Sequence, residues 1–157
     1  DWIYAASWLI ASSVAHSARG LRGACEEASP AGIRPLLTWK STAAAPTPSE
    51  MLAAFFVSLG EYVVSTACYG CPFLNAAAEF PDPEHPAHQL AVAHKRVVRE
   101  RFRELAAAAG VDQPDALAGE LVLLMDGAYM TARMFGASPD NPSHHLAEAA
   151  RRLLDAG

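Results

Sequence analysis

Hydrophobic residues recur every three or four positions from about residue 49 onward, a spacing that predicts helices rather than strands. The first such stretch predicts a helix that begins at Ser49, which can serve as the N-cap, and ends near Cys68. A glycine break then leads into a short apolar helix over residues 73–80, with Pro72 in its first turn. The pattern therefore favours an all-α domain.

A long amphipathic helix is predicted from Pro86 to Gly110. Charged residues are expected on its solvent-facing sides, namely Lys95, Arg96, Arg99, Arg101 and Arg103. Its buried face is expected to carry Leu90, His94, Val97, Val98, Phe102, Leu105 and Ala109.

Two further helices are predicted near the C-terminus. The first, over residues 117–135, follows a cap at Asp112 and a first-turn Pro114, and it is apolar on nearly all sides except for Asp126. A helix that is apolar on every side must be covered on every side. The last helix is predicted over residues 143–156.

The first 47 residues have a less regular pattern. Residues 2–28 are loosely helical, and a flexible link rich in small residues and proline is expected over residues 29–48. We therefore divide the chain into an N-terminal helical segment and linker, residues 1–47, and a main domain, residues 48–157.

Length and charge narrow the possible functions. With 157 residues, 52% of them hydrophobic, the chain is long enough for one domain with a substantial core. It has 12 Lys and Arg against 17 Asp and Glu, a net charge of -5, whereas nucleic-acid binders are usually basic. The most apolar run, residues 2–14, is shorter than the ~20 residues of a membrane span. We expect neither a phosphate-binding surface nor a membrane association.

The candidate reactive residues favour no catalytic or metal chemistry. Three cysteines leave one unpaired under any disulfide scheme, which indicates a reducing cytoplasm. Cys68 and Cys71 have a metal-binding spacing, but tetrahedral zinc needs a second pair of ligands and none follows. The histidines at 85 and 88 are interpreted as part of a solvated loop. No nucleophile and base set is recognisable, so we expect a non-enzyme without metal or cofactor.

Two strings in the sequence carry a resemblance to a known family. GCPFLNAAAEFPDPEHP, at residues 70–86, and LVLLMDGA, at residues 121–128, resemble the short helix and the next-to-last helix in one branch of the TetR-family C-terminal regulatory domains. The resemblance covers about residues 48–157. It implies a helical bundle that binds a small effector inside and forms a homodimer through its last two helices.

The N-terminal part departs from that family. A full-length relative begins with a three-helix DNA-binding head, and residues 1–47 lack its pattern, with only Arg19, Arg22, Arg34 and Lys40 as cations. We expect DNA to be bound only through a head that this chain lacks. Removal of such a head and a naturally headless relative both remain open.

The expected effector is small and mostly apolar. Three polar candidates on apolar faces are Asn75, His94 and Asp126, which could contact the ligand or tie helices together. The apolar candidates come from three helices and could equally be core residues: Phe55, Phe56, Leu59, Tyr62, Phe73, Val98 and Phe102.

The dimer prediction rests on the helix over residues 117–135 and the helix that follows it. Two copies of this pair would form a four-helix interface, unless residues 2–14 cover the excess apolar face. The predicted interface residues are Leu121, Leu124, Ala128, Leu146, Ala150 and Leu153.

These observations predict the effector-sensing and dimerisation domain of a TetR-like transcriptional regulator, a repressor type, located in the cytoplasm. The alternative is a headless helical module that pairs with another protein without binding DNA. A small helical enzyme is a third possibility.

Overall fold

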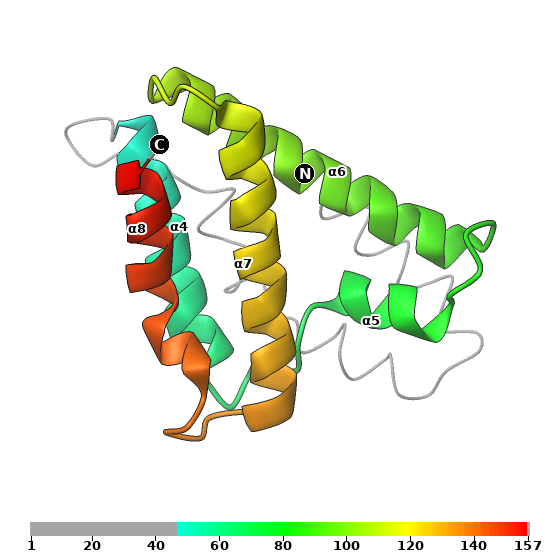
Figure 1. The fold of residues 1–157 in the computed structure, drawn as a ribbon. Helices are drawn as coiled ribbons and strands as arrows, with labels where there is room; N and C mark the ends of the chain where they lie inside the picture. Colours follow the sequence, from blue (N-terminus) through cyan, green and yellow to red (C-terminus); the bar gives the residue numbers. More distant parts are fainter. Residues whose placement is uncertain (1–46, 157) are drawn as a thin grey trace.

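The computed structural model describes residues 47–156, which form an all-α bundle (Figure 1). The all-α prediction is thus confirmed for this part of the chain, while the predictions for residues 1–46 lie outside it. The elements are α4 (Pro48–Val63), α5 (Pro72–Glu79), α6 (Pro86–Ala108), α7 (Pro114–Phe135), the 3-10 turn η1 (Pro142–His145) and α8 (Leu146–Ala156).

Helix α4 begins earlier and ends earlier than the sequence pattern predicts. Thr47, and not Ser49, is the N-cap: its hydroxyl accepts from the Glu50 N–H at 3.2 Å, and the Glu50 carboxylate accepts from the Thr47 N–H at 2.7 Å. This reciprocal capping box satisfies two N–H groups that the helix cannot pair itself. At the other end, the Ser65 hydroxyl donates to the Tyr62 carbonyl at 2.7 Å, so the helix stops at Val63 and not near Cys68.

Prolines mark the starts of the other long helices, as predicted. Pro86 and Pro114 occupy the first turns of α6 and α7, where a missing N–H costs nothing. Gly110 ends the α6 segment with a φ of 83°, a conformation that favours glycine. The predicted cap at Asp112 is wrong: the N-cap of α7 is Gln113, whose side chain makes no capping hydrogen bond.

A hydrogen-bonded turn replaces the start of the predicted last helix. Asn141, only 1% exposed, donates from its amide to the Gly136 carbonyl at 2.8 Å and accepts from the Ser143 N–H at 2.9 Å. The Ser143 hydroxyl also reaches the Ala128 carbonyl of α7 at 3.3 Å. These bonds hold residues 142–145 in the 3-10 turn, and the α-helix therefore begins at Leu146 rather than Ser143.

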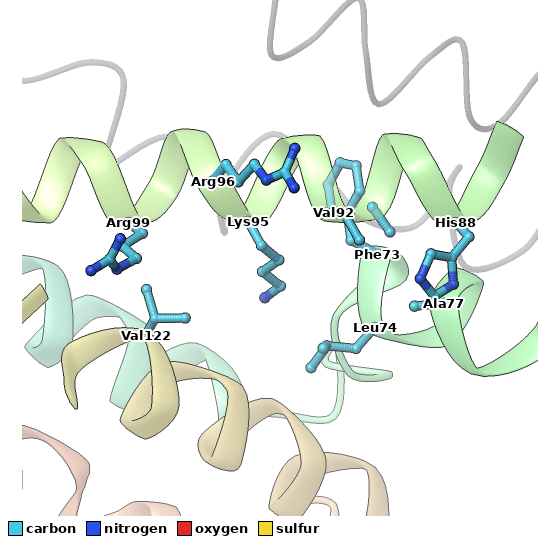
Figure 2. A pocket seen from close by; sticks show the side chains of 10 residues that line it. Phe73, Leu74, Ala77, His88, Val92, Lys95, Arg96, Arg99 and Val122 are labelled. Carbon is cyan, nitrogen blue, oxygen red and sulfur yellow. The ribbon is translucent and has the colours of Figure 1, made fainter. Parts of the chain in front are cut away.

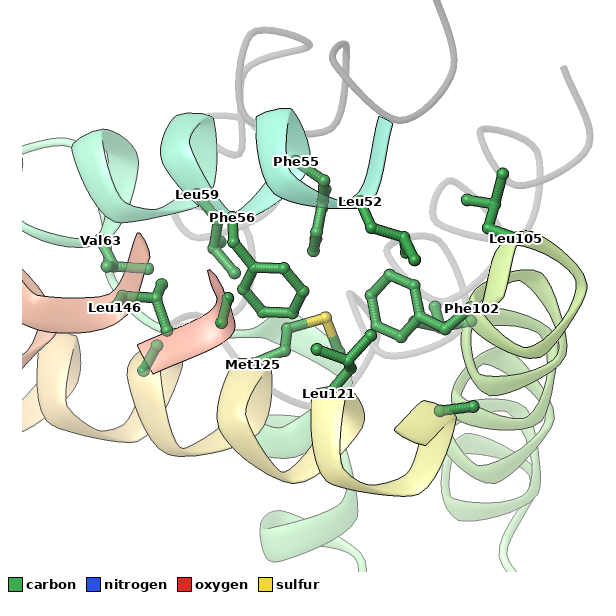
Figure 3. Packing of buried hydrophobic residues seen from close by; sticks show 14 of the residues in the cluster. Leu52, Phe55, Phe56, Leu59, Val63, Phe102, Leu105, Leu121, Met125 and Leu146 are labelled. Atoms are coloured by element: carbon green, nitrogen blue, oxygen red, sulfur yellow. The ribbon is translucent and has the colours of Figure 1, made fainter. Parts of the chain in front are cut away.

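The main core lies where α7 packs against α4, α6 and α8 (Figure 3). Three aromatic rings form its centre: the Phe55 ring lies 5.0 Å from the Phe56 ring and 5.4 Å from the Phe102 ring. Aliphatic side chains from the four helices surround them, including Leu52, Leu59, Val63, Leu105, Leu121, Met125 and Leu146. Helix α5 packs on α6 through a separate, smaller apolar cluster.

The buried face of α6 differs from the predicted one. Leu90, His94 and Val97 are half-buried and Ala109 is exposed, while Ala87, Ala91 and Ala106 are buried beside the predicted Val98, Phe102 and Leu105. Lys95, predicted to face solvent, is half-buried. Small alanines allow α5 and α7 to approach α6 closely. Lys95 lies between the buried Ala91 and Val98 on the same face of α6, and it is therefore partly covered.

Among residues 47–156, no helix is long and apolar enough to cross a membrane.

Replacing Phe56 by alanine should lower the free energy of unfolding by about 3–5 kcal/mol, because the fully buried ring would leave a cavity beside Phe102. The matched control is Val57→Ala on the same helix, where the side chain is 48% exposed and a change within about 0.5 kcal/mol is expected. Urea denaturation followed by circular dichroism measures both. Equal losses in the two variants would contradict this packing.

Candidate ligand cavity

A cavity of about 290 Å³ lies between α5, α6 and α7 (Figure 2). Helix α6 contributes one long stripe to it, because positions three or four apart fall on the same helix face. The apolar part of the lining consists of Phe73, Leu74 and Ala77 of α5, Ala91 and Val92 of α6, and Val122 of α7. The polar part is His88, Lys95, Arg96 and Arg99, all from α6.

Lys95 links the cavity to Asp126 in the middle of α7. The two side chains form an ion pair, and they are 18% and 25% exposed. A partly buried carboxylate without a cation would be costly, so this pair accounts for the presence of Asp126 in an apolar helix. The predicted site residue Asp126 thus contacts a cavity-lining side chain without lining the cavity itself.

His94 does not line the cavity, but it packs against Phe73, which does. Its ring stacks on the Phe73 ring, with centroids 3.6 Å apart and planes within 6°. Burial, with a smaller effect of the neighbouring Lys95 charge, lowers the pKa of His94 from 6.5 to about 4. The imidazole is therefore neutral at pH 7 and acts as a flat, largely apolar partner for Phe73.

Two thiols and two phenols lie close together, and Cys71 and Tyr129 are near Asp126 of the ion pair. Burial raises the pKa of both the Cys68 and the Cys71 thiol, and it raises the pKa of Tyr62 to about 12 and also raises that of Tyr129. All four groups are thus protonated at neutral pH. Because the thiolate is the nucleophile and metal ligand, the buried thiols are poorly suited to either role. No group of three or more potential metal ligands occurs within residues 47–156.

Most of the predicted apolar ligand residues do not reach the cavity. Phe55, Phe56, Leu59, Val98 and Phe102 belong to the main core, where they fill the space between α4, α6 and α7. Tyr62 is half-buried against the same cluster. Of the predicted residues, Phe73 alone appears in the lining of this cavity.

The remaining polar candidate, Asn75, ties helices together. Its side-chain oxygen accepts a hydrogen bond from the Arg133 guanidinium, which connects α5 to the C-terminal part of α7. Gly70, just before α5, has a φ of 89° and lies close to the same part of α7. These contacts position α5, and with it one wall of the cavity.

The sequence pattern does not predict the cations of the cavity, because charged residues on an amphipathic helix usually face solvent. A signal was present: His88, Val92, Lys95 and Arg99 share one face of α6 by their spacing, and that face also carries Ala91. A fully solvated helix face carries mainly charged and polar residues, whereas this face of α6 also carries small apolar residues.

Helix α7 leaves one apolar face uncovered among the described residues. Leu123 is 74% exposed and Met134 is 70% exposed, with Met130 and Phe135 also exposed. Gly127 adds to this surface, and a Cβ placed there would meet no atom within 4 Å. We call Leu123, Gly127, Met130 and Met134 the open α7 face.

The predicted interface residues mostly lie elsewhere. Leu121, Ala128, Leu146 and Ala150 are buried in the core of the domain itself, so a second copy could not contact them in this conformation. Leu124 and Leu153 are half-buried at the core's edge. The interface residues were not predictable because α7 is apolar on nearly all sides. In such a helix, the sequence does not indicate which stripe of residues faces the core.

The fold and these two surfaces define a class of protein: an all-α domain with an open cavity beside its central helix and an uncovered apolar face among the described residues. Residues 48–150 match the family model of the tetracyclin repressor-like C-terminal domain. The chain therefore belongs to this family, as the two sequence strings indicated.

The similar proteins are named as transcriptional regulators, and two of them as TetR-type regulators. The HTH-type transcriptional regulator YjdC of Escherichia coli is 32% identical over 108 residues, which is 68% of this chain and 56% of the relative. A TetR-family transcriptional regulator from Streptomyces coelicolor superposes with a TM-score of 0.65 at 31% identity, covering 72% of this chain and 59% of that one. A TetR-type regulator from Streptomyces avermitilis gives a TM-score of 0.66 at 26% identity, with coverages of 92% and 79%. The chain thus spans little more than half of the curated relative.

Acidification should destabilise the domain through His94. The pKa of about 4 in the folded state lies below the ordinary 6.5, so the unfolded chain binds the proton more readily. Stability is complete above pH 6.5 and is lost as the pH falls toward 4. Between pH 7.5 and pH 5 the loss amounts to about 2 kcal/mol.

The measurement is urea denaturation at both pH values for the wild type and for His94→Gln, which cannot titrate. The variant should lose about 2 kcal/mol less than the wild type over this interval. An identical loss in the two proteins would mean that His94 is not held neutral by burial.

Proposed function

We propose that this chain contains the effector-sensing and dimerisation domain of a TetR-type transcriptional regulator. The observation that carries the proposal is the cavity between α5, α6 and α7, within a domain of this family. The relatives named above are transcriptional regulators, which supports a regulatory role rather than an enzymatic one.

The size of the cavity supports a small ligand. Its volume of about 290 Å³ is near the lower end of the ~300–1,000 Å³ common for ligand sites. At roughly 30 Å³ per water-sized atom, it holds about ten non-hydrogen atoms. Six of its ten lining residues are apolar, so most of that ligand should be apolar as well.

The open α7 face supports a second copy of this chain as its partner. Leu123, Met130 and Met134 lie on one side of α7 at helical spacing, and Gly127 between them allows close approach of another helix. A two-fold arrangement of α7 and α8 from each copy would bury this face in a four-helix interface. The partly buried Leu124 and Leu153 would extend it.

The proposed ligand and dimer functions meet at α7. The cavity touches α7 through Val122, and the adjacent Leu123 belongs to the open α7 face. A ligand that favours one arrangement of α6 against α7 would shift the orientation of the two copies. In an intact regulator, this change would alter the spacing of two DNA-binding heads.

Filling the cavity should abolish binding of a neutral apolar probe. Octan-1-ol at about ten times its Kd should raise the Tm of the wild type by roughly 4 °C. Ala77→Phe places a ring in the cavity and should remove the shift, whereas Ala78→Phe, at the exposed neighbouring position of α5, should preserve it. Differential scanning calorimetry measures the shifts. An unchanged shift in Ala77→Phe would place the probe elsewhere.

Negative charges introduced on the open α7 face should dissociate the proposed dimer. The wild type is expected to be a dimer at micromolar concentration, and Leu123→Glu combined with Met130→Glu should be monomeric, because four carboxylates would then meet at a two-fold interface. Val57→Glu, at an exposed apolar position of α4, is the control and should stay dimeric. Sedimentation equilibrium gives the masses. A monomeric wild type, or a dimeric double variant, would contradict the proposed interface.

A further inference from the structure

The charge of the cavity is unusual for this chain. The protein as a whole carries a net charge of -5, yet the cavity lining contains Lys95, Arg96 and Arg99 and no acidic side chain. Lys95 is 18% exposed and Arg96 and Arg99 are exposed, so Lys95 attracts an anion more strongly than a cation in open water does, while the two arginines add positive charge at the mouth of the cavity. The cavity therefore has the chemistry for a ligand with a negative end.

The cations and most of the apolar residues occupy different ends of the cavity, while Val122 of α7 lies at the cationic end beside Arg99. Along the α6 stripe, the apolar Ala91 and Val92 precede the three cations, and α5 packs beside the apolar part (Figure 2). From Ala91 to Arg99 the helix rises about 12 Å. A ligand lying along α6 would thus meet apolar groups at one end and cations at the other.

The ion pairs already present define how much charge the ligand should carry. Asp126 balances Lys95, and Asp115 balances Arg99 with an N–O distance of 3.1 Å. Arg96 forms no ion pair with any residue among 47–156. The net charge at this end is therefore about +1, which suits a monoanion better than a dianion.

We propose that the ligand is an apolar monocarboxylate, with its carboxylate at Lys95, Arg96 and Arg99 and its apolar body against Phe73 and Leu74 of α5. This inference rests on the proposed function, because it takes the same cavity as the effector site. A short aliphatic acid and an arylacetic acid both have this chemistry, at about ten non-hydrogen atoms.

Lys95 gives such a ligand a direct effect on helix packing. Its ammonium group reaches Asp126 across the gap between α6 and α7, and this is a largely buried side-chain link between the two helices. A ligand carboxylate competes with Asp126 for the same ammonium group. Binding thereby weakens the contact that joins α6 to α7 beside the open α7 face.

The test compares octanoate with octan-1-ol and octylammonium, which differ mainly in the charge of the head group. Isothermal titration calorimetry at pH 7 should give octanoate a Kd about tenfold lower than that of octan-1-ol, as expected for a charge-assisted hydrogen bond, and octylammonium should bind most weakly. Phenylacetate distinguishes an aromatic body from an aliphatic one. Octyl phosphate, with a higher charge, should bind less tightly than octanoate.

Variants locate the anion site. Arg96→Gln should weaken octanoate binding about fivefold or more and leave octan-1-ol unchanged, while Arg101→Gln, which pairs with Glu104 on α6 and does not line the cavity, should change neither. Asp126→Asn removes the competitor for Lys95 and should tighten octanoate binding several-fold. Circular dichroism establishes that each variant is folded, and the exposed Arg96 and Arg101 are positions that tolerate substitution.

The possible results distinguish failure of the monocarboxylate inference from failure of the proposed function. Equal affinities for octanoate and octan-1-ol, or tighter binding of octylammonium or octyl phosphate, would overturn the monocarboxylate inference and leave the cavity as an effector site. Octanoate binding that is insensitive to Arg96→Gln would also overturn it. Failure of all the probes, including octan-1-ol, would overturn both the inference and the proposed function.

Discussion

The position of a single carboxylate constrains much of this bundle. Asp126 lies in the middle of an otherwise apolar helix, and a charge that is three-quarters covered needs a cation within reach. Lys95 supplies this cation. Its side chain therefore points inward from α6 toward α7, and the ion pair fixes how α6 packs against α7. The space left beside the pair, closed by α5, is the cavity. The ion pair and the candidate site therefore have the same origin.

Helix α7 contributes both to the buried core of the domain and to an apolar surface that the described residues leave uncovered. Its apolar side chains extend around the whole circumference, and α4, α6 and α8 cover three sides. The side with Leu123, Met130 and Met134 stays uncovered among residues 47–156. An apolar strip of this kind on a helix is typical of a surface that binds another protein. One helix thus borders the cavity, the core and the proposed interface, so the proposed ligand would lie close to the proposed interface.

Much of the fold could be predicted from the sequence, whereas the site could not. Prolines at first turns and apolar spacing located the helices, but a pattern cannot show whether Thr47 or Ser49 caps α4. Phe56 and Phe102 were predicted to line a pocket, yet large rings from neighbouring helices fill the space between them and form the core. Lys95 was missed because its partner lies 31 residues away, on another helix. Contacts of this kind depend on how helices are rotated against each other, which residue spacing alone does not determine.

The central claim is that the cavity between α5, α6 and α7 is the ligand site. A crystal structure with octanoate brominated at its terminal carbon tests it most directly, because bromine is located by its anomalous scattering. We expect a bromine peak beside Phe73 and Leu74, with carboxylate density near Lys95 and Arg96. A peak within the core around Phe55 and Phe102, or no bound molecule with either brominated octanoate or brominated octan-1-ol at a saturating concentration, would contradict it.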